Sequence, residues 1–408
     1  FNIEEDVFDF PLDGFDALIF SYSFFMLANE LSQEFKNKIN SFSGIKVAIF
    51  QDEYNSFLRH RGNLKAFDIT AIVTLVPEQH WHDVFCEGFS HLPHLHTLAG
   101  YIPEYLKELS RNMLPLAQRR WHIGYRGRVM QPILGKLARE KYDIGVSMKA
   151  LCELNGIPAN IEVEENKRIY GEGWINFIRD CRVLLGTESG SNVFDFDGRI
   201  SKQIAEYHSL HPSAPFDVIH AECIGNAEGQ LKMNQISPKM FEAIAVGTGH
   251  ILFEGEYSGI LKPWKHYIPL KKDYSNLSEV FDAVNDTELL QGMIEQSISD
   301  VVLSGEYSYE RFIRRVDDFL DSLNVPAVPA RPWQPVAALQ KMPRMFSDDE
   351  LRGLQQAETK RVAALAAGYT GKTVLFFGAG AAFEKYKHFF AKANVVGMLV
   401  DDAYIKAL

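Results

Sequence analysis

The chain has 408 residues, of which 46% are hydrophobic and 23% charged, and its formal net charge is -11 at pH 7. This length allows two or three domains, and the composition is that of an ordinary globular protein. The negative balance argues against nucleic acid and broad anionic-lipid binding, although it permits a local basic site for a phosphate group. No run of about 18 apolar residues and no signal-peptide pattern is present. We therefore expect no transmembrane segment and a cytoplasmic protein, while peripheral membrane association stays open.

Residues 1–115 alternate short apolar runs with helical patterns. This rhythm predicts a parallel sheet covered on both faces, in which ligands meet the carboxyl ends of the strands. The predicted strands are Asp16–Phe20, Ile45–Phe50 and Ile69–Leu75, and the predicted helices are Met26–Ser41 and Glu78–Phe85.

Polar residues follow two of these strands. A carboxylate at such an edge could act as a general base toward an acceptor hydroxyl, so Asp52, Glu53 and His80 are candidate catalytic residues. Alternatively, Asp52 and Glu53 cap the next helix, and His80 and His82 belong to a polar helix start. No metal site is expected, because the spacing of the two histidines does not place both rings on one helix face.

A second strand, glycine turn and helix pattern begins at Trp121–Arg128. Arg126 and Arg128 lie in its turn, and the planar guanidinium group suits phosphate because it donates paired, charge-assisted bonds. The alternative is that these arginines are merely solvated. Further along, the predicted elements are helix Leu134–Ala150, strand Ile161–Val163, helix Trp174–Asp180 and strand Cys181–Leu185, with a mostly helical insertion at 199–230.

The loop Gly186–Asn192 follows a predicted strand and is rich in small residues. Glycine and serine permit close backbone approach to a ligand, and Glu188 could bind a sugar hydroxyl. Because such residues are also common in ordinary loops, a purely structural role is the alternative.

The most informative stretch is Gln235–Phe253. Ser237 is a favoured N-cap residue and Pro238 a favoured first helical residue, so a short helix is predicted, followed by a buried strand from His250. A helix N-terminus attracts phosphate, and Glu242 lies about 1.5 turns into the helix, where it could accept a hydrogen bond from a sugar hydroxyl. The stretch could therefore hold both ends of a nucleotide diphosphate.

The run Ser237–Thr248 resembles the donor-site helix of glycosyltransferases with the two-domain GT-B fold, in the family "glycosyl transferases group 1". Gly255–Gly259 and His266–Asp273 also resemble this family, especially its bacterial branch related to spore-coat maturation glycosyltransferases. The similarity extends over roughly residues 120–320. Many members carry a glutamate eight positions before the one that matches Glu242, whereas this chain has Asn234 there.

The resemblance implies an α/β fold with two Rossmann-like domains facing a cleft. These would be an acceptor domain at 1–115 and a nucleotide-sugar domain at 116–305, with a helix at 306–324 crossing back to the first domain. A predicted proline-rich linker at 325–345 leads to a partial Rossmann-like βαβ module at 346–408. Phe383 replaces the third glycine of a dinucleotide-binding turn at Gly378 and Gly380.

The implied activity is transfer of a sugar from a nucleotide-diphosphate sugar to a glycan, lipid-linked or protein acceptor, in surface polysaccharide or glycoconjugate biosynthesis. The enzyme would be of the hexosyltransferase type, independent of metal and without a cofactor apart from this co-substrate. The expected donor nucleotide-binding residues are Arg126, Arg128, Ser237, Pro238, Lys239 and Glu242, and those near the donor sugar or cleft are Glu188, Ser189 and Asn234.

Other functions stay open. A sugar-nucleotide epimerase or a phosphorylase would use the same fold. A non-catalytic nucleotide-sugar-binding assembly module is supported by Asn234 and by the appended tail. An NAD-dependent oxidoreductase would rest only on Gly378 and Gly380.

Overall fold

The structure is a computed structural model of the chain that describes residues 12, 15–22, 33–55, 57–85, 88–323, 373–377 and 394–399. It divides into two compact units, Phe1–Arg331 and Pro332–Leu408, and each is described by itself. Several predicted segments lie outside the described residues, namely 26–32 of the first predicted helix, the linker 325–345 and most of the predicted module 346–408.

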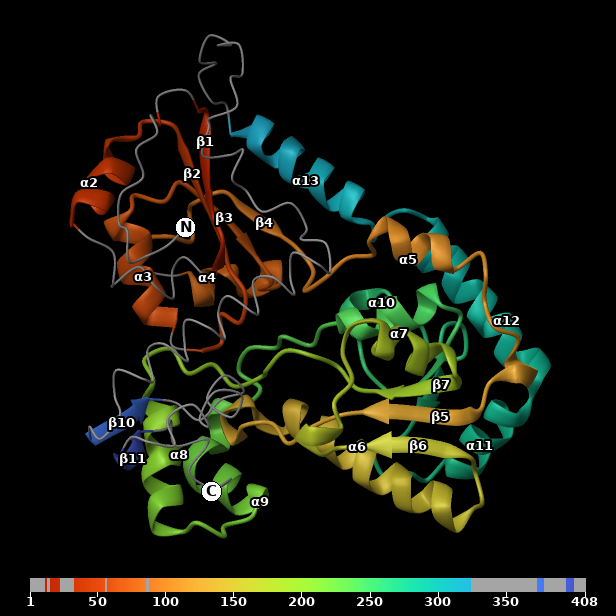
Figure 1. Ribbon diagram of the computed structural model, residues 1–408. Coiled ribbons are helices and arrows are strands. Elements are labelled where there is room, and N and C mark those ends of the chain that lie inside the picture. Colours follow the sequence, from red (N-terminus) through yellow and green to blue (C-terminus); the bar gives the residue numbers. More distant parts are fainter. Residues whose placement is uncertain are drawn as a thin grey trace. The chain divides into compact units, whose positions relative to one another are not determined.

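The first sheet consists of four parallel strands in the order β1-β2-β3-β4 (Figure 1). One face packs against the first helices through a cluster that includes Phe35, Phe57 and Phe85. The other face, with Val47 and Val73, packs against side chains of a late helix. The strands are β1 Ala17–Phe20, β2 Ile45–Ile49, β3 Ala71–Thr74 and β4 His94–His96, and the helices are α2 Gln33–Ser41, α3 Phe57–Ala66, η3 Glu78–His80 and α4 Trp81–Val84.

The second sheet has five parallel strands in the order β6-β5-β7-β8-β9. This is the doubly wound order, in which the chain leaves a central strand, runs first to one edge and then to the other. Its strands are β5 Trp121–Arg126, β6 Ala159–Glu162, β7 Cys181–Gly186, β8 Gly249–Phe253 and β9 Ile268–Leu270.

Helices cover both faces of the second sheet. On one face α6 (Gly135–Leu154) packs Ile144 and Met148 against the strands, together with α11 (Leu277–Asn285) and α12 (Thr287–Ser297). On the other face α7 (Gly171–Arg179) and α10 (Pro238–Ala245) enclose a smaller cluster (Figure 1). The strands are buried on both faces, and this explains why they are nearly continuous apolar runs.

Helix α13 (Tyr309–Ser322) returns from the second sheet to the first (Figure 1). Phe319, Leu320 and Leu323 contact the free face of the first sheet, and Arg315 donates to the carbonyl of His96 at 2.8 Å. The predicted helical insertion is present as α8 Arg199–Leu210, α9 Phe216–Ile219, the π-helix η7 His220–Ile224 and η8 Gly225–Ala227. The remaining helices are α5 Glu104–Leu109, η4 Leu116–Gln118, η5 Pro132–Leu134, η6 Glu165–Lys167, η9 Tyr257–Gly259 and the π-helix η10 Ile298–Leu303.

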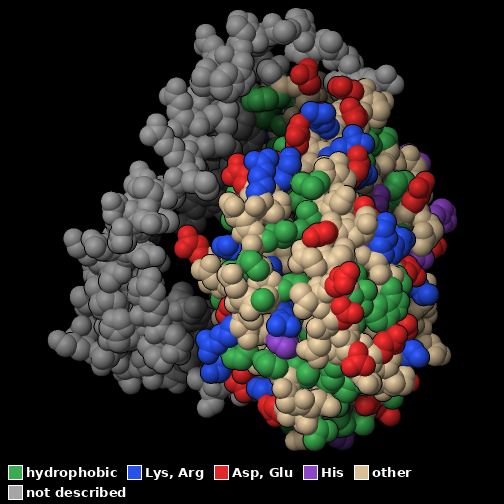
Figure 2. Space-filling model, turned by 90° about the vertical axis from the view of Figure 1, so that its right-hand side faces the viewer, with side chains coloured by type: hydrophobic (Ala, Val, Ile, Leu, Met, Phe, Trp, Pro, Cys, Tyr) green, Lys and Arg blue, Asp and Glu red, His purple; other side chains and the backbone are tan. Residues whose placement is uncertain are grey.

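In the second unit, β10 (Thr373–Phe377) and β11 (Asn394–Leu399) form a parallel pair. The expected class, α/β with two Rossmann-like domains, is thus confirmed, while the helix expected between β10 and β11 lies outside the described residues and the domain boundaries stay predictions. On the face of the first unit shown in Figure 2, acidic and basic side chains are interspersed. No helix in the described part of the chain combines the length and apolar character needed to cross a membrane.

Candidate functional site

A pocket of about 480 Å³ lies at the carboxyl end of the second sheet. Arg126 and Gly127 contribute to it from the end of β5, and Gly186 and Thr187 from the end of β7. In this doubly wound sheet the strand order reverses at β5 and β7, and a crevice forms outside the carboxyl ends of strands at such a point. The topology alone therefore accounts for the pocket.

The N-terminus of α10 forms part of the wall through Ser237 and Lys239. The predicted helix is confirmed, with Ser237 at the N-cap and Pro238 as the first helical residue. Ser237 occupies the N-cap position with an extended backbone, yet its hydroxyl accepts no bond from the helix. Pro238 does not line the pocket. Its ring lies against the backbone of Gly100, where a Cβ would stand 2.9 Å from the Pro238 Cγ atom.

Five cationic side chains line this pocket, whereas Glu242 is the one carboxylate among its described lining residues. The cations are Arg126, Arg128, Lys141, Arg168 and Lys239. Burial, reinforced by Lys239 and Arg128, lowers the pKa of Lys141 to about 8. Burial also lowers the pKa of Lys239, with Arg168 adding to the effect. Lys141 and Lys239 are therefore repelled by neighbouring cations, and a bound anion would relieve this repulsion.

The two predicted arginines differ in how many contacts they make with the protein. Arg126 donates to the carbonyls of Tyr125 and Asn160 at 2.7 and 2.9 Å, and its guanidinium lies 4.2 Å from the centre of the Phe177 ring. Arg128 is half exposed, and its nearest carboxylate, that of Glu165, is 3.9 Å away. Arg128 is thus the more available of the two for a ligand.

Glu242 is held in place by Trp174. The indole Nε1 of Trp174 donates to Glu242 Oε2 at 2.7 Å, and the Nζ of Lys239 lies 5.3 Å from the centre of the same indole ring. Because Trp174 engages only one carboxylate oxygen, Glu242 retains acceptor capacity toward a ligand hydroxyl.

Glu188 is buried beside the pocket and is fully engaged by protein donors. Its Oε1 accepts from the backbone N–H groups of Glu256 and Tyr257 at 2.8 and 2.9 Å, and its Oε2 accepts from Asn234 at 2.6 Å. Asn234 also accepts from the side chain of Asn192 at 3.0 Å. This network ties the loop after β7 to the segment before α10, and neither Glu188 nor Asn234 lines the pocket.

Ser189 connects this network to the cations, because Lys141 Nζ donates to its hydroxyl at 3.1 Å. Ser189 also pairs with Gln235 through two backbone bonds of 2.8 and 3.0 Å. Lys141 therefore extends from α6 across to the loop after β7.

The three candidates in the first domain do not line this pocket. Asp52 is exposed and accepts from the Tyr54 hydroxyl at 2.6 Å. Glu53 is buried beside the carboxyl end of β3, accepting from the Thr74 hydroxyl and from the Leu75 N–H. Burial raises the pKa of Glu53, and its Oε2 has no partner among the described residues. His80 accepts from the N–H of Lys232 at 3.3 Å.

The alternative in which Asp52 and Glu53 cap the next helix is wrong, since α3 begins at Phe57 and Glu53 is buried. Their catalytic roles and that of His80 stay predictions. Sequence reasoning missed Lys141, Arg168, Trp174 and His250 as pocket residues. Each lies within a helix, strand or turn whose sequence carries no ligand-binding motif. Only the fold brings these four side chains to the same pocket. Among the described residues no group of three or more His, Cys, Asp or Glu side chains could hold a metal ion.

The fold and the pocket together define the class of this protein. It has two Rossmann-like domains, with a cationic pocket at the reversal point of the second sheet. This arrangement can bind a ligand that carries an anionic group and hydroxyl groups.

No protein-family model matches this chain, and no curated protein sequence matches it. Several solved structures are similar to it. A TarM mutant from S. aureus, in complex with fondaparinux, alpha-GlcNAc-glycerol and UDP, is 10% identical with a TM-score of 0.41. The match covers 69% of this chain and 52% of that one. This chain therefore spans about half the length of the TarM structures that it matches.

Two further structures match over most of their own length. An alpha-glucosyltransferase in complex with UDP and a mismatched DNA is 9% identical with a TM-score of 0.45, covering 75% of this chain and 80% of that one. HepE from Anabaena, in complex with UDP and glucose, is 9% identical with a TM-score of 0.39, covering 74% of this chain and 80% of that one.

Proposed function

We propose that this chain is a glycosyltransferase that binds a nucleotide-diphosphate sugar in the pocket of the second domain. The observation that carries the proposal is the cluster of five cations beside Glu242, two of which, Lys141 and Lys239, are repelled by their cationic neighbours, at the carboxyl end of a doubly wound sheet. A diphosphate with an attached ribose matches this arrangement, because it presents both negative charge and hydroxyl groups.

Different pocket residues would bind different parts of the ligand. Arg128, Lys141 and Lys239 would bind the diphosphate, together with the N-terminus of α10, and would stabilise the charge that develops as the diphosphate leaves. Glu242, held by Trp174, would accept from a ribose hydroxyl. Arg126 would act mainly by its charge, since its guanidinium already donates to protein carbonyls.

The acceptor hydroxyl would be activated by a carboxylate of the first domain or by the leaving phosphate itself. Of the two carboxylates, Asp52 is exposed, whereas Glu53 is buried and has one oxygen without a partner among the described residues. The acceptor is proposed to be a glycan, a lipid-linked sugar or a protein, in surface polysaccharide or glycoconjugate synthesis. The transfer is proposed to proceed without a metal ion.

Titration calorimetry with UDP, GDP, dTDP and CMP, and with their sugar derivatives, tests the donor assignment. We expect one nucleotide to bind, and we expect Glu242→Ala to weaken its binding at least about tenfold. Glu242→Gln keeps an acceptor for Trp174 and for a hydroxyl, so it should weaken binding less. Glu254→Ala, in an exposed position outside the pocket, is the matched control. Equal affinities of wild type and Glu242→Ala would contradict the assignment.

A second candidate is a non-catalytic nucleotide-sugar-binding module. It is favoured by the closed network of Glu188, Asn234 and Asn192, in which both the carboxylate and the amide are already satisfied. Slow hydrolysis of the bound donor by the wild type, abolished in Glu242→Ala, would exclude this candidate. Product analysis with and without an acceptor would separate a transferase from an epimerase.

A further inference from the structure

A second groove, of about 500 Å³, lies on the surface of the first unit. It shares no lining residue with the cationic pocket. Its residues come from the loop before β9 and from the exposed side of α12. They are Trp264, Lys265, Asp286, Glu288, Leu289, Gly292, Met293 and Gln296.

Trp264 is the most unusual residue of this groove. The residue is 41% exposed, and its backbone has φ of 57°, in the left-handed region that bulky residues rarely adopt. A glycine would adopt this backbone conformation without strain, and a buried indole ring would stabilise the fold. Trp264 therefore strains the backbone and leaves apolar surface in water. Backbone strain of this kind concentrates at sites of function.

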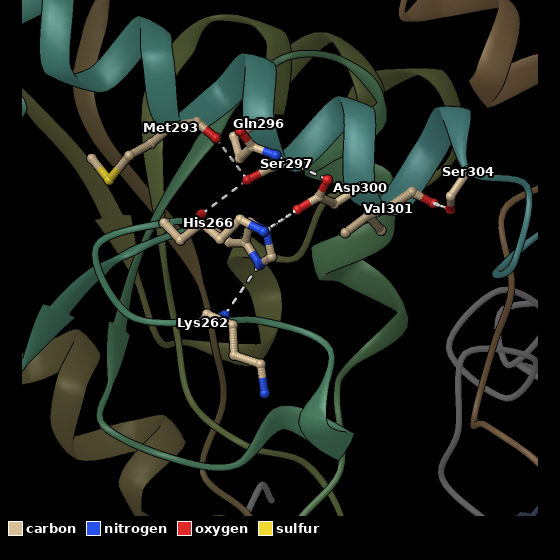
Figure 3. Close-up of polar contacts among 9 residues, drawn as sticks. Lys262, His266, Met293, Gln296, Ser297, Asp300, Val301 and Ser304 are labelled. Carbon is tan, nitrogen blue, oxygen red and sulfur yellow. Dashed lines mark hydrogen bonds and ion pairs between the residues drawn. The ribbon is translucent and has the colours of Figure 1, made fainter.

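A set of polar contacts holds the Trp264 loop rigidly against α12 and η10 (Figure 3). His266 is almost fully buried, and its Nδ1 accepts from the Lys262 N–H at 3.1 Å while its Nε2 contacts Asp300 at 2.9 Å. Ser297 donates to the carbonyl of His266 at 3.1 Å. These bonds fix the loop on either side of Trp264.

The floor beside the ring is open and partly apolar. A Cβ atom placed on Gly292 would meet no atom within 4 Å, and Leu289 next to it is 40% exposed. Polar groups lie around this floor: the carboxylates of Asp286 and Glu288, and the carbonyl oxygen of Gln296, whose amide group donates to Asp300. The charge of Lys265 is balanced by Asp300 at 2.6 Å, so the rim is acidic.

We propose that this groove is a binding site for a neutral glycan chain, separate from the donor pocket. A flat aromatic face packs against the apolar face of a sugar ring, while nearby carboxylate and amide oxygens accept bonds from its hydroxyls. The acidic rim disfavours polyanionic glycans. A stable protein partner would need about 800 Å² of contact with an apolar centre, whereas the apolar part of this lining is Trp264, Leu289 and Met293. The inference does not require the proposed donor chemistry.

The test follows the indole N–H resonance of Trp264 by NMR during titration with maltoheptaose, cellohexaose and chitohexaose, and with a heparin fragment of similar length. Trp264→Phe assigns the resonance. We expect a shift with at least one neutral chain, and a loss of affinity of about tenfold or more in Trp264→Gly. This variant removes the left-handed strain, so its melting temperature should not fall. Tyr105→Ala, which removes another exposed ring, is the control and should bind normally.

Three results would overturn the inference. These are no shift with any neutral chain, a shift with the heparin fragment alone, and self-association of the wild type that Trp264→Gly abolishes. Nucleotide affinity measured on the same variants separates this inference from the proposed function. Trp264→Gly should bind nucleotide as the wild type does, and failure of nucleotide binding in the wild type would count only against the proposed function.

Discussion

Lys141 links the loop after β7 to the cation cluster, and its pKa of about 8 makes it the most pH-sensitive of these cations. A bound diphosphate favours the protonated amine and so raises this pKa. Nucleotide affinity should therefore be constant below about pH 8 and should fall above it, by up to about tenfold per pH unit. Calorimetric titrations between pH 7 and pH 10 would measure this decline.

The control for this prediction is Lys141→Arg, because a guanidinium keeps its charge throughout the same range. In this variant the affinity should stay level to higher pH. If wild type and variant decline in parallel, the pH dependence arises elsewhere and Lys141 does not contact the diphosphate.

His250 on β8 lies beneath the pocket, and neither ring nitrogen has a partner among the described residues. Burial lowers its pKa to about 4, compared with about 6.5 in an unfolded chain. Below pH 6.5 the unfolded state binds a proton that the folded state does not bind. The free energy of unfolding should therefore fall as pH decreases from about 6.5 to 4, with His250 contributing about 3 kcal/mol.

His250→Leu removes both the titration and two unpaired polar atoms, so it should be at least as stable as the wild type at pH 7. Urea unfolding at pH 7, 6 and 5 should show a smaller loss of stability in this variant. His211→Leu, at an exposed histidine, is the matched control. Equal slopes for wild type and His250→Leu would contradict the prediction.

At the scale of elements, the loop after β7 depends on Gly190. Its φ is 93°, and a Cβ atom would lie 2.0 Å from the carbonyl oxygen of Met233. Gly190→Ala should therefore lower the free energy of unfolding by about 3 kcal/mol or more and weaken nucleotide binding. Gly156→Ala is the control, since Gly156 also has positive φ but open space around it, and it should cost about 1 kcal/mol. Thermal unfolding and calorimetry would measure both effects, and equal costs would contradict the role of this contact.

The elements most accurately predicted from the sequence have strong local signals. The Ser237–Pro238 start and the apolar spacing that follows identified α10, and the buried strands of the second sheet are continuous apolar runs. Helix α3 and strand β4 were missed, because α3 contains Gly62 and many basic residues and β4 has only three residues. Their formation depends on packing against the first sheet, which no local pattern reveals.

The candidate site was only partly predictable for a related reason. Arg128, Lys239 and Glu242 adjoin a turn or a helix start, where the sequence indicates ligand contact. Lys141 and Trp174 lie within helices, and their role follows from the fold that brings α6 and α7 to one pocket. The network of Glu188 with Asn234 was likewise invisible, since its partners are 46 positions apart.

At the scale of the whole molecule, the first unit is expected to be self-sufficient. A fragment comprising residues 1–325 retains α13, whose side chains cover one face of the first sheet. This fragment should fold cooperatively and bind nucleotide with the affinity of the full chain. Calorimetric titration together with circular dichroism would check this. An insoluble fragment, or one that has lost nucleotide binding, would show that the boundary is wrongly placed.

Every lining residue of the cationic pocket lies between Tyr125 and His250, so the second domain alone supplies the contacts to a ligand there. A transferase built in this way can load its activated sugar before any acceptor arrives. Water would then be the first competitor for the reactive carbon, and under the proposed function hydrolysis of the donor is the side reaction to be suppressed.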